Sequence, residues 1–102
     1  MKRISKLISQ GKLLISDGAW GTYLHAPGLK QGDCPELWNI DKKKKVLKIA
    51  QSYINAGADM IGTNSFGGNQ IKLNYFDLGD RTYDINKAAA EISREATGDE
   101  NL

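Results

Sequence analysis

The chain has 102 residues, of which 40% are hydrophobic and 25% charged, and 14 Lys and Arg against 12 Asp and Glu leave a formal charge of +2. This composition is close to that of an average globular protein and argues against a disordered, collagen-like or coiled-coil chain. The near balance of charge also gives no reason to expect a nucleic acid or a membrane as partner. From the length we expect one small domain over residues 1–102 and no second domain.

The first predicted element is a short helix over residues 3–10, in which Ile4, Leu7 and Ile8 share one face and after which Gly11 ends the helix. Polar residues interrupt the apolar run that a secretory signal needs, so we do not expect export. No segment reaches the roughly 18 apolar residues of a membrane span. The sequence therefore predicts a cytoplasmic protein.

A short strand is predicted over the apolar run 13–15, which is bounded by Gly11 and by the Asp17-Gly18 pair and has the pattern of a strand buried on both faces. A loop rich in Gly and Pro follows from residue 20 to residue 41, and residues 36–39 within it are expected to form a turn of helix. Long ordered loops in compact domains usually carry function.

A helix is predicted over residues 42–56, with Asp41 as its N-cap and Gly57 as its left-handed C-terminal residue. Its apolar stripe consists of Val46, Leu47, Ile49, Ala50, Tyr53 and Ile54. A second short, buried strand is predicted directly after it, over residues 59–63.

Two more helices are predicted after a polar loop at residues 64–68, one over residues 69–76 and one over residues 83–97. The inward-facing residues of the last helix are expected to be Ile85, Ala88, Ala89, Ile92 and Ala96. Two short strands, each followed by a helix, predict parallel pairing through a right-handed crossover. The fold class predicted from the sequence is therefore α/β.

Two polar clusters, at residues 17–22 and 63–67, directly follow the two predicted strands. In parallel α/β folds the loops at this end of the strands bind ligands. The carboxylate of Asp17 suits a ligand's ammonium group, and the neighbouring glycines would let backbone N–H groups approach a ligand's carboxylate. A zwitterionic small molecule fits both, although a simple tight turn at Asp17-Gly18 is the structural alternative.

The remaining polar residues give weaker signals. His25 is a lone histidine for which a surface or packing role is favoured, and Cys34, the only cysteine, lacks an evident base and is expected to be a spectator thiol. Glycines at positions 18, 21, 67 and 68 do not fit the Walker A or dinucleotide fingerprints. Four aromatic residues could stack on a ligand, but aromatic residues at the base of loops more often close a core. They are Trp20, Tyr23, Trp38 and Phe66. No catalytic residue and no metal ligand is assigned.

Five motifs resemble, in order and spacing, segments of the homocysteine S-methyltransferase family. The sequence DGAWGT at residues 17–22 is similar to the family's opening DGAxGT signature. It is followed by ELWN at 36–39, YINAGADMI at 53–61, TNSFG at 63–67 and NKAA at 86–89. The resemblance spans about residues 13–97, and TNSFG is nearer to the cobalamin-dependent methionine synthase branch than to the branch that uses S-methylmethionine.

The resemblance implies the N-terminal portion of a (β/α)8 TIM barrel, about two β/α units plus an N-terminal helix, with homocysteine bound at the C-terminal ends of the strands. In that family a zinc ion lowers the pKa of the homocysteine thiol, and the thiolate receives a methyl group to give methionine. By the motif match, Asp17 helps to hold the amino group and the neighbouring backbone contacts the substrate. The substrate-binding residues implied are Asp17, Gly18, Ala19, Gly21, Thr63 and Asn64.

The chain also departs from the family pattern. The family's zinc ligands are three cysteines in segments that this chain does not contain, and Cys34 matches none of them. A full barrel takes about 250 residues. Zinc is therefore expected only in the full-length family, and cobalamin and methyltetrahydrofolate only through other domains, so the methyl donor is not named by this sequence.

Three hypotheses follow from the match and the departures. The favoured one is an N-terminal fragment of a homocysteine methyltransferase that is inactive alone. The second is a small non-enzymatic α/β module that binds an amino acid or forms oligomers. The third is an active barrel completed by a partner chain that supplies the missing strands and the three cysteines. Self-association, or pairing with the missing part of the barrel, is expected because two parallel strands leave their edges unpaired.

Overall fold

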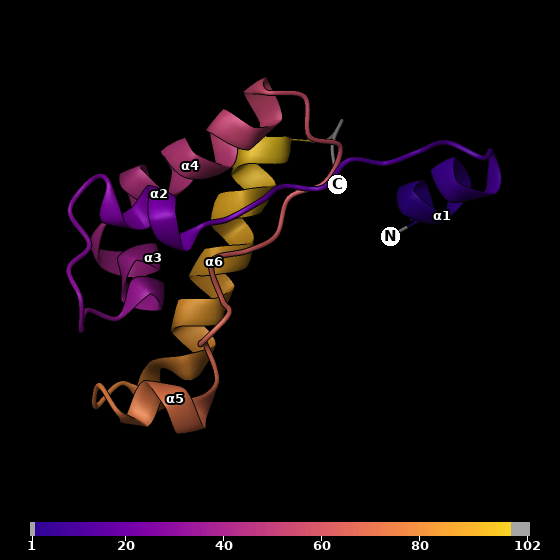
Figure 1. Ribbon diagram of the computed structural model, residues 1–102. Coiled ribbons are helices and arrows are strands. Elements are labelled where there is room, and N and C mark those ends of the chain that lie inside the picture. Colours follow the sequence, from indigo (N-terminus) through magenta and orange to yellow (C-terminus); the bar gives the residue numbers. More distant parts are fainter. Residues whose placement is uncertain (1, 99–102) are drawn as a thin grey trace.

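The computed structural model describes residues 2–98; residue 1 and residues 99–102, which the predicted domain includes, lie outside the described residues. The elements in chain order are α1 (Lys2–Ser9), α2 (Gly21–His25), η1 (Pro35–Leu37), α3 (Trp38–Asp41), α4 (Lys43–Asn55), α5 (Gln70–Asn74), η2 (Gly79–Arg81) and α6 (Thr82–Thr97). Figure 1 shows α1 apart from the other helices, at the end of an extended segment, and the long α4 and α6 side by side. The longest dimension is accordingly 45 Å.

The predicted α/β fold, with two β/α units of a TIM barrel, is wrong: the elements of residues 2–98 are helical, and no strand is formed among them. The two segments predicted as strands lie side by side but share a single isolated parallel bridge, between Ser16 and Met60. The amide of Asp17 donates to the Met60 carbonyl at 3.0 Å, and the amides of Asp59 and Met60 donate to the Ile15 carbonyl at 2.7 and 3.2 Å. A pair this short, with no third strand beside it, does not extend into a ladder.

Burial also differs from the prediction for the first of these segments. Leu13 is 85% exposed and Ile15 is 59% exposed, so the apolar run 13–15 is not buried on both faces. Parallel strands become buried when helices cover both faces of their sheet, and here the segment runs between α1 and the helical body (Figure 1). Residues 13–15 are therefore exposed because no helices cover them on both sides, and not because their local sequence is unsuited to a strand.

The predicted helices are confirmed more closely. Helices α1, α4 and α6 match the predictions within a residue or two, whereas α5 is shorter than predicted. Gly57 follows α4 with a φ of +104°, as expected of a left-handed residue after a helix. The prediction of Asp41 as N-cap is wrong, because Asp41 ends α3 and Lys42 takes the N-cap position without a side-chain hydrogen bond. Asn69 caps α5, accepting a hydrogen bond from the Lys72 amide at 2.8 Å.

The core lies between helices rather than under a sheet. A larger cluster joins α2, α3, α4 and α6 through Leu24, Leu29, Trp38, Val46, Ile49 and Ile92. A smaller cluster, made of Cys34, Leu73 and Ile85, joins α5 to the first turn of α6. Both clusters place the loop that contains η1 and α3 against α6, and this packing brings the two polar motifs of the sequence together.

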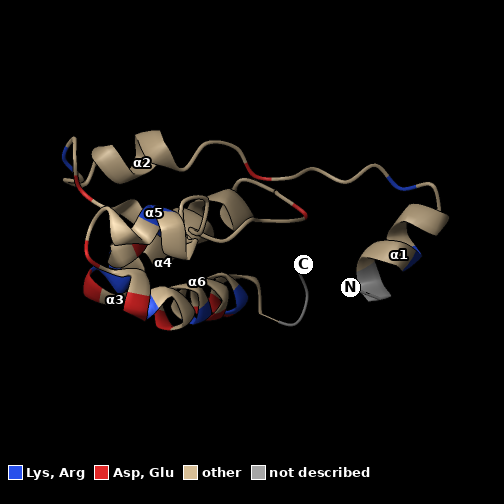
Figure 2. Cartoon of the chain, turned by 90° about the horizontal axis from the view of Figure 1, so that it is seen from below, with Lys and Arg blue, Asp and Glu red and all other residues tan. Residues whose placement is uncertain are grey.

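The surface carries charges of both signs. Along α6, Lys and Arg alternate with Asp and Glu (Figure 2). One such pair, Lys87 and Glu91, is 3.7 Å apart and exposed, so we expect it to add only about 0.3–0.5 kcal/mol to the free energy of unfolding. None of the helices within residues 2–98 is both long and apolar enough to cross a membrane.

Candidate functional site

A hollow of about 420 Å³ is lined by both of the polar motifs that the sequence singled out. Of the predicted site residues, Asp17 and Gly21 line it from the first motif, and Thr63 and Asn64 from the second. Gly18 and Ala19 belong to the same first loop but are not among the residues that line the hollow. The start of η1 contributes Glu36, which was not among the predicted site residues.

The carboxylate of Asp17 is held by donors from three directions. Its Oδ2 accepts hydrogen bonds from the Trp20 indole at 2.7 Å and from the Gly62 amide at 2.8 Å, and its Oδ1 accepts one from the Ser16 hydroxyl at 3.0 Å. Partial burial raises the pKa of Asp17, but these hydrogen bonds outweigh burial and leave the pKa below its ordinary value. Asp17 is therefore an ionised, oriented group at the wall of the hollow.

Tyr53 of α4 holds the first loop in place. Its hydroxyl donates a short hydrogen bond to the carbonyl of Ala19. A Cβ atom at Gly18 would lie 3.3 Å from the same hydroxyl oxygen, so a glycine there lets the tyrosine approach. The Tyr53 ring also meets Tyr23 edge to face at 5.6 Å and lies 6.5 Å from the ring of Trp20. Burial raises the pKa of the Tyr53 hydroxyl, and the neighbouring Tyr23 and Asp17 raise it further, so the hydroxyl stays a donor.

Replacing Tyr53 by phenylalanine should lower the free energy of unfolding by about 1 kcal/mol, because the carbonyl of Ala19 loses its donor while the ring packing remains. Urea unfolding followed by circular dichroism measures this change. Tyr83→Phe is the matched control, since the ring of Tyr83 is 75% exposed. Equal stability of the two variants would contradict the role given to the Tyr53 hydroxyl.

Asn64 lines the hollow, but its side-chain amide is used inside the protein. Its Nδ2 donates to the Pro35 carbonyl at 2.9 Å and to Asn39 Oδ1 at 3.0 Å. In return, Nδ2 of Asn39 donates to the carbonyls of Asn64 and Ile85 at 2.8 and 3.2 Å. Both asparagines are almost completely buried. Asn64 thus ties the second motif to the loop and to α6 and is not free to bind a ligand through this amide.

The exposed part of the second motif is formed by Thr63 and Phe66. The Thr63 hydroxyl lies 2.5 Å from the Ser65 hydroxyl, and Thr63 is exposed at the hollow. Phe66 is 98% exposed and lines the same hollow. Of the two polar residues that were predicted from this motif, Thr63 rather than Asn64 is therefore the one exposed at the hollow.

Glu36 is the residue that the sequence reasoning missed. It is only 6% exposed, and its Oε2 accepts a hydrogen bond from the Gly67 amide at 3.0 Å. Its Oε1 accepts a weak one from the Cys34 thiol at 3.7 Å. The only signal in the sequence was its place in the ELWN motif, because nothing in residue type or spacing predicts the burial of a glutamate.

Cys34 and His25 make local contacts. Burial, together with the nearby charge of Glu36, raises the pKa of the Cys34 thiol, so the thiol is not activated as a nucleophile. The His25 Nδ1 lies 2.7 Å from the Leu29 carbonyl, which is a local packing contact. Over residues 2–98 no three His, Cys, Asp or Glu side chains come together as a metal site would require. The donor set of these residues does not fit the zinc that the resemblance implies.

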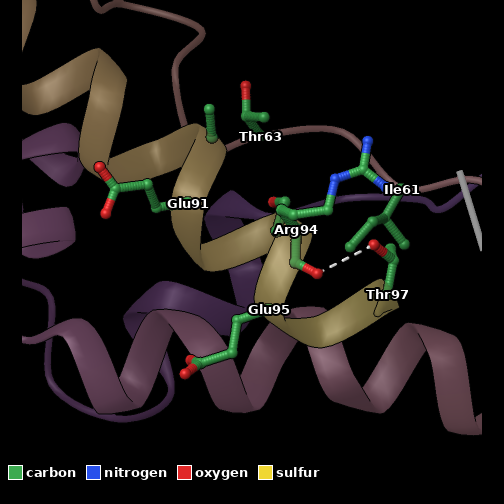
Figure 3. A pocket seen from close by; sticks show the side chains of 8 residues that line it. Ile61, Thr63, Glu91, Arg94, Glu95 and Thr97 are labelled. Atoms are coloured by element: carbon green, nitrogen blue, oxygen red, sulfur yellow. Dashed lines mark hydrogen bonds between the residues drawn. The ribbon is translucent and has the colours of Figure 1, made fainter. Parts of the chain in front are cut away.

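Larger hollows exist elsewhere on the surface, but none joins the two polar motifs. One of about 640 Å³ lies between α6 and the extended segment that contains Ile61 (Figure 3). In this view the carboxylates of Glu91 and Glu95 point away from the guanidinium of Arg94. The polar groups of this larger hollow do not converge on one point, so the smaller hollow at Asp17 is the better candidate for a binding site.

Comparison with known proteins gives one consistent family. The model of the homocysteine S-methyltransferase family matches residues 14–101. A methionine synthase of Mycobacterium tuberculosis (strain ATCC 25618 / H37Rv) is 34% identical over 89 residues, which are 81% of this chain and 8% of that protein. A methionine synthase of Mycobacterium leprae (strain TN) is 32% identical over 89 residues, 81% of this chain and 7% of that protein. The chain thus spans less than a tenth of the length of these relatives.

Proposed function

Because the chain belongs to the homocysteine S-methyltransferase family, we propose that the hollow at Asp17 forms part of the homocysteine site of an enzyme that methylates the homocysteine thiol to give methionine. The observation that carries this proposal is the position of Asp17. Its carboxylate is held ionised by three donors at the wall of a hollow where two of the family's motifs meet. A fixed carboxylate of this kind is suited to a ligand's ammonium group.

The remaining hydrogen-bonding capacity of the first loop supports the same assignment. Oδ1 of Asp17 accepts one hydrogen bond, from Ser16, and a carboxylate oxygen has room for two. The amide groups of Ala19 and Gly21 have no hydrogen-bond partner within the described part of the chain and suit a ligand's carboxylate. In this proposal the loop binds the amino-acid end of homocysteine, and Thr63 lies along the same pocket.

Methyl transfer by this chain alone is not part of the proposal. The family's three thiolate ligands for zinc cannot come from a sequence with one cysteine, and the described donor groups do not fit a metal. We propose that zinc, and any cobalamin or methyltetrahydrofolate, act through residues that this chain does not contain. In this proposal the chain by itself binds homocysteine but does not methylate it. We expect the chain to be cytoplasmic.

Titration of the purified chain with homocysteine by isothermal calorimetry tests this function. Homocysteine should bind, and 4-mercaptobutyrate, which differs from it only by lacking the amino group, should bind more weakly by about 1.5–3 kcal/mol because it makes no charge-assisted contact with Asp17. Absence of heat with homocysteine, or equal affinity for the two ligands, would overturn the proposal.

Self-association, or pairing with a further part of the family's domain, also remains a proposal. The exposed apolar side chains of Leu13 and Ile15 on the segment before the first motif support it. Size-exclusion chromatography with light scattering measures it, and a folded monomer at all concentrations would contradict self-association.

A further inference from the structure

Glu36 is a buried carboxylate without a cationic partner. It is 6% exposed, and glutamate is almost never buried to this degree unless it is paired. Among the side chains of residues 4–98 the ion pair between Lys87 and Glu91 is the only one present, so Glu36 forms no ion pair with a Lys, Arg or His of that part of the chain. The direct polar partners of its carboxylate are therefore hydrogen-bond donors.

These hydrogen bonds leave Glu36 with unused capacity. Its Oε2 accepts from the amide of Gly67 at 3.0 Å, and its Oε1 accepts only from the thiol of Cys34 at 3.7 Å, which is a weak donor. A Cβ atom at Gly67 would lie 3.3 and 3.4 Å from the two carboxylate oxygens and 3.4 Å from Cδ of Lys72, so the glycine leaves room for both side chains beside the loop. Two carboxylate oxygens accept about four hydrogen bonds, and the protein supplies one strong one.

The hollow that Glu36 lines is negatively charged. Asp17 and Glu36 both line it, and no Lys, Arg or His is among the residues that do. Two carboxylates on one small hollow repel each other, and a buried charge is costly unless it is paired. An occupant that carries a cationic group removes this cost and gains charge-assisted hydrogen bonds.

We propose that Glu36 is a second acceptor for the ligand's ammonium group, so that the amino group of an α-amino acid contacts Glu36 as well as Asp17. This inference rests on the proposed function and extends it by naming a substrate-binding residue in η1. A purely structural role for Glu36, limited to holding the Gly67 amide, is the competing explanation. If Glu36 binds the ligand, its negative charge is needed for affinity. If its role is purely structural, a neutral side chain of the same shape is enough.

The substitution Glu36→Gln separates them, because it keeps an oxygen for the Gly67 amide and removes the charge. Binding of homocysteine and of 4-mercaptobutyrate is measured by calorimetry for the full chain and the variant. We expect the affinity for homocysteine to fall about 10-fold or more, and the affinity for 4-mercaptobutyrate to stay the same or rise. Glu95→Gln, which removes the same charge from an exposed site on α6, should leave both affinities unchanged.

Each outcome decides the question. An equal loss of affinity for both ligands, or no loss for either, overturns the role of Glu36 while the native chain's preference for homocysteine still supports the proposed function. Failure of the native chain to bind either ligand overturns both proposals. If circular dichroism shows that Glu36→Gln does not fold, Glu36→Asp replaces it, since this change keeps the charge but withdraws it by one methylene. The shorter side chain should weaken homocysteine binding more than 4-mercaptobutyrate binding, and an equal effect on both overturns the inference.

Discussion

Replacing Asn39 by alanine is expected to lower the free energy of unfolding by about 3 kcal/mol, because the change removes three buried hydrogen bonds and leaves a cavity. Asn39 is 1% exposed, and its side chain donates to the carbonyls of Asn64 and Ile85 and accepts from the Asn64 side chain. These bonds tie the second motif to the loop and to α6. The substitution should therefore destabilise the fold and also release one wall of the hollow.

Thermal unfolding followed by circular dichroism measures this effect, and for a domain of this size we expect the midpoint to fall by roughly 10–20 °C. Asn55→Ala is the matched control, since Asn55 is exposed at the end of α4. Similar midpoints for the two variants would show that the buried asparagine pair is not a main support of the structure.

Replacing Asp17 by asparagine is expected to weaken homocysteine binding by a factor of about 10–100, equivalent to on the order of 1.5–3 kcal/mol. An asparagine still offers an oxygen to the donors of Trp20 and Gly62, so the loop keeps its shape while the charge that attracts the ammonium group is removed. Calorimetric titration gives the affinity. Asp33→Asn serves as control because Asp33 is exposed and accepts a hydrogen bond from the amide of Lys30. Unchanged affinity in Asp17→Asn would exclude Asp17 from the site.

The low pKa of Asp17 adds a pH dependence to the same experiment. Because the folded chain holds the pKa of Asp17 below the ordinary value of 3.8, this carboxylate stabilises the fold at pH values above 3.8. The stabilisation is lost as the pH falls through the lower, folded-state pKa. Urea unfolding between pH 5 and pH 3 should therefore show a steeper loss of stability in the native chain than in Asp17→Asn, and parallel curves would contradict the assignment.

Helices were the part of the fold that the sequence predicted well. The apolar spacing of α4 and α6 is a local pattern, and its residues Val46, Ile49, Ile85 and Ile92 are buried as expected. The N-cap of α4 was missed, because the short α3 ends at Asp41 and the two helices follow each other almost without a break. The apolar spacing shows where a helix can form, but the first residue of α4 depends on where the preceding helix α3 ends.

The site was predicted in part. The motif match led to Asp17, Gly21 and Thr63, and all three line the hollow. It also led to Asn64, whose amide is taken up by Pro35 and by the buried partner Asn39. The match gave no role to Glu36. A motif shows which residues go together in a family, but hydrogen-bond partners and burial depend on residues 25 or more positions away.

The sequence by itself determined the long helices, the two polar motifs and the family to which the chain belongs, because these depend on residue order and short-range spacing. Tertiary structure alone decided that the two apolar segments meet at one bridge, between Ser16 and Met60, and form no sheet. It also decided that Glu36 is buried beside Asp17 at one hollow. The physical reason is the same for both: a strand or a buried charge is stable only with partners that come from elsewhere in the chain, and a sequence pattern does not show whether those partners are present.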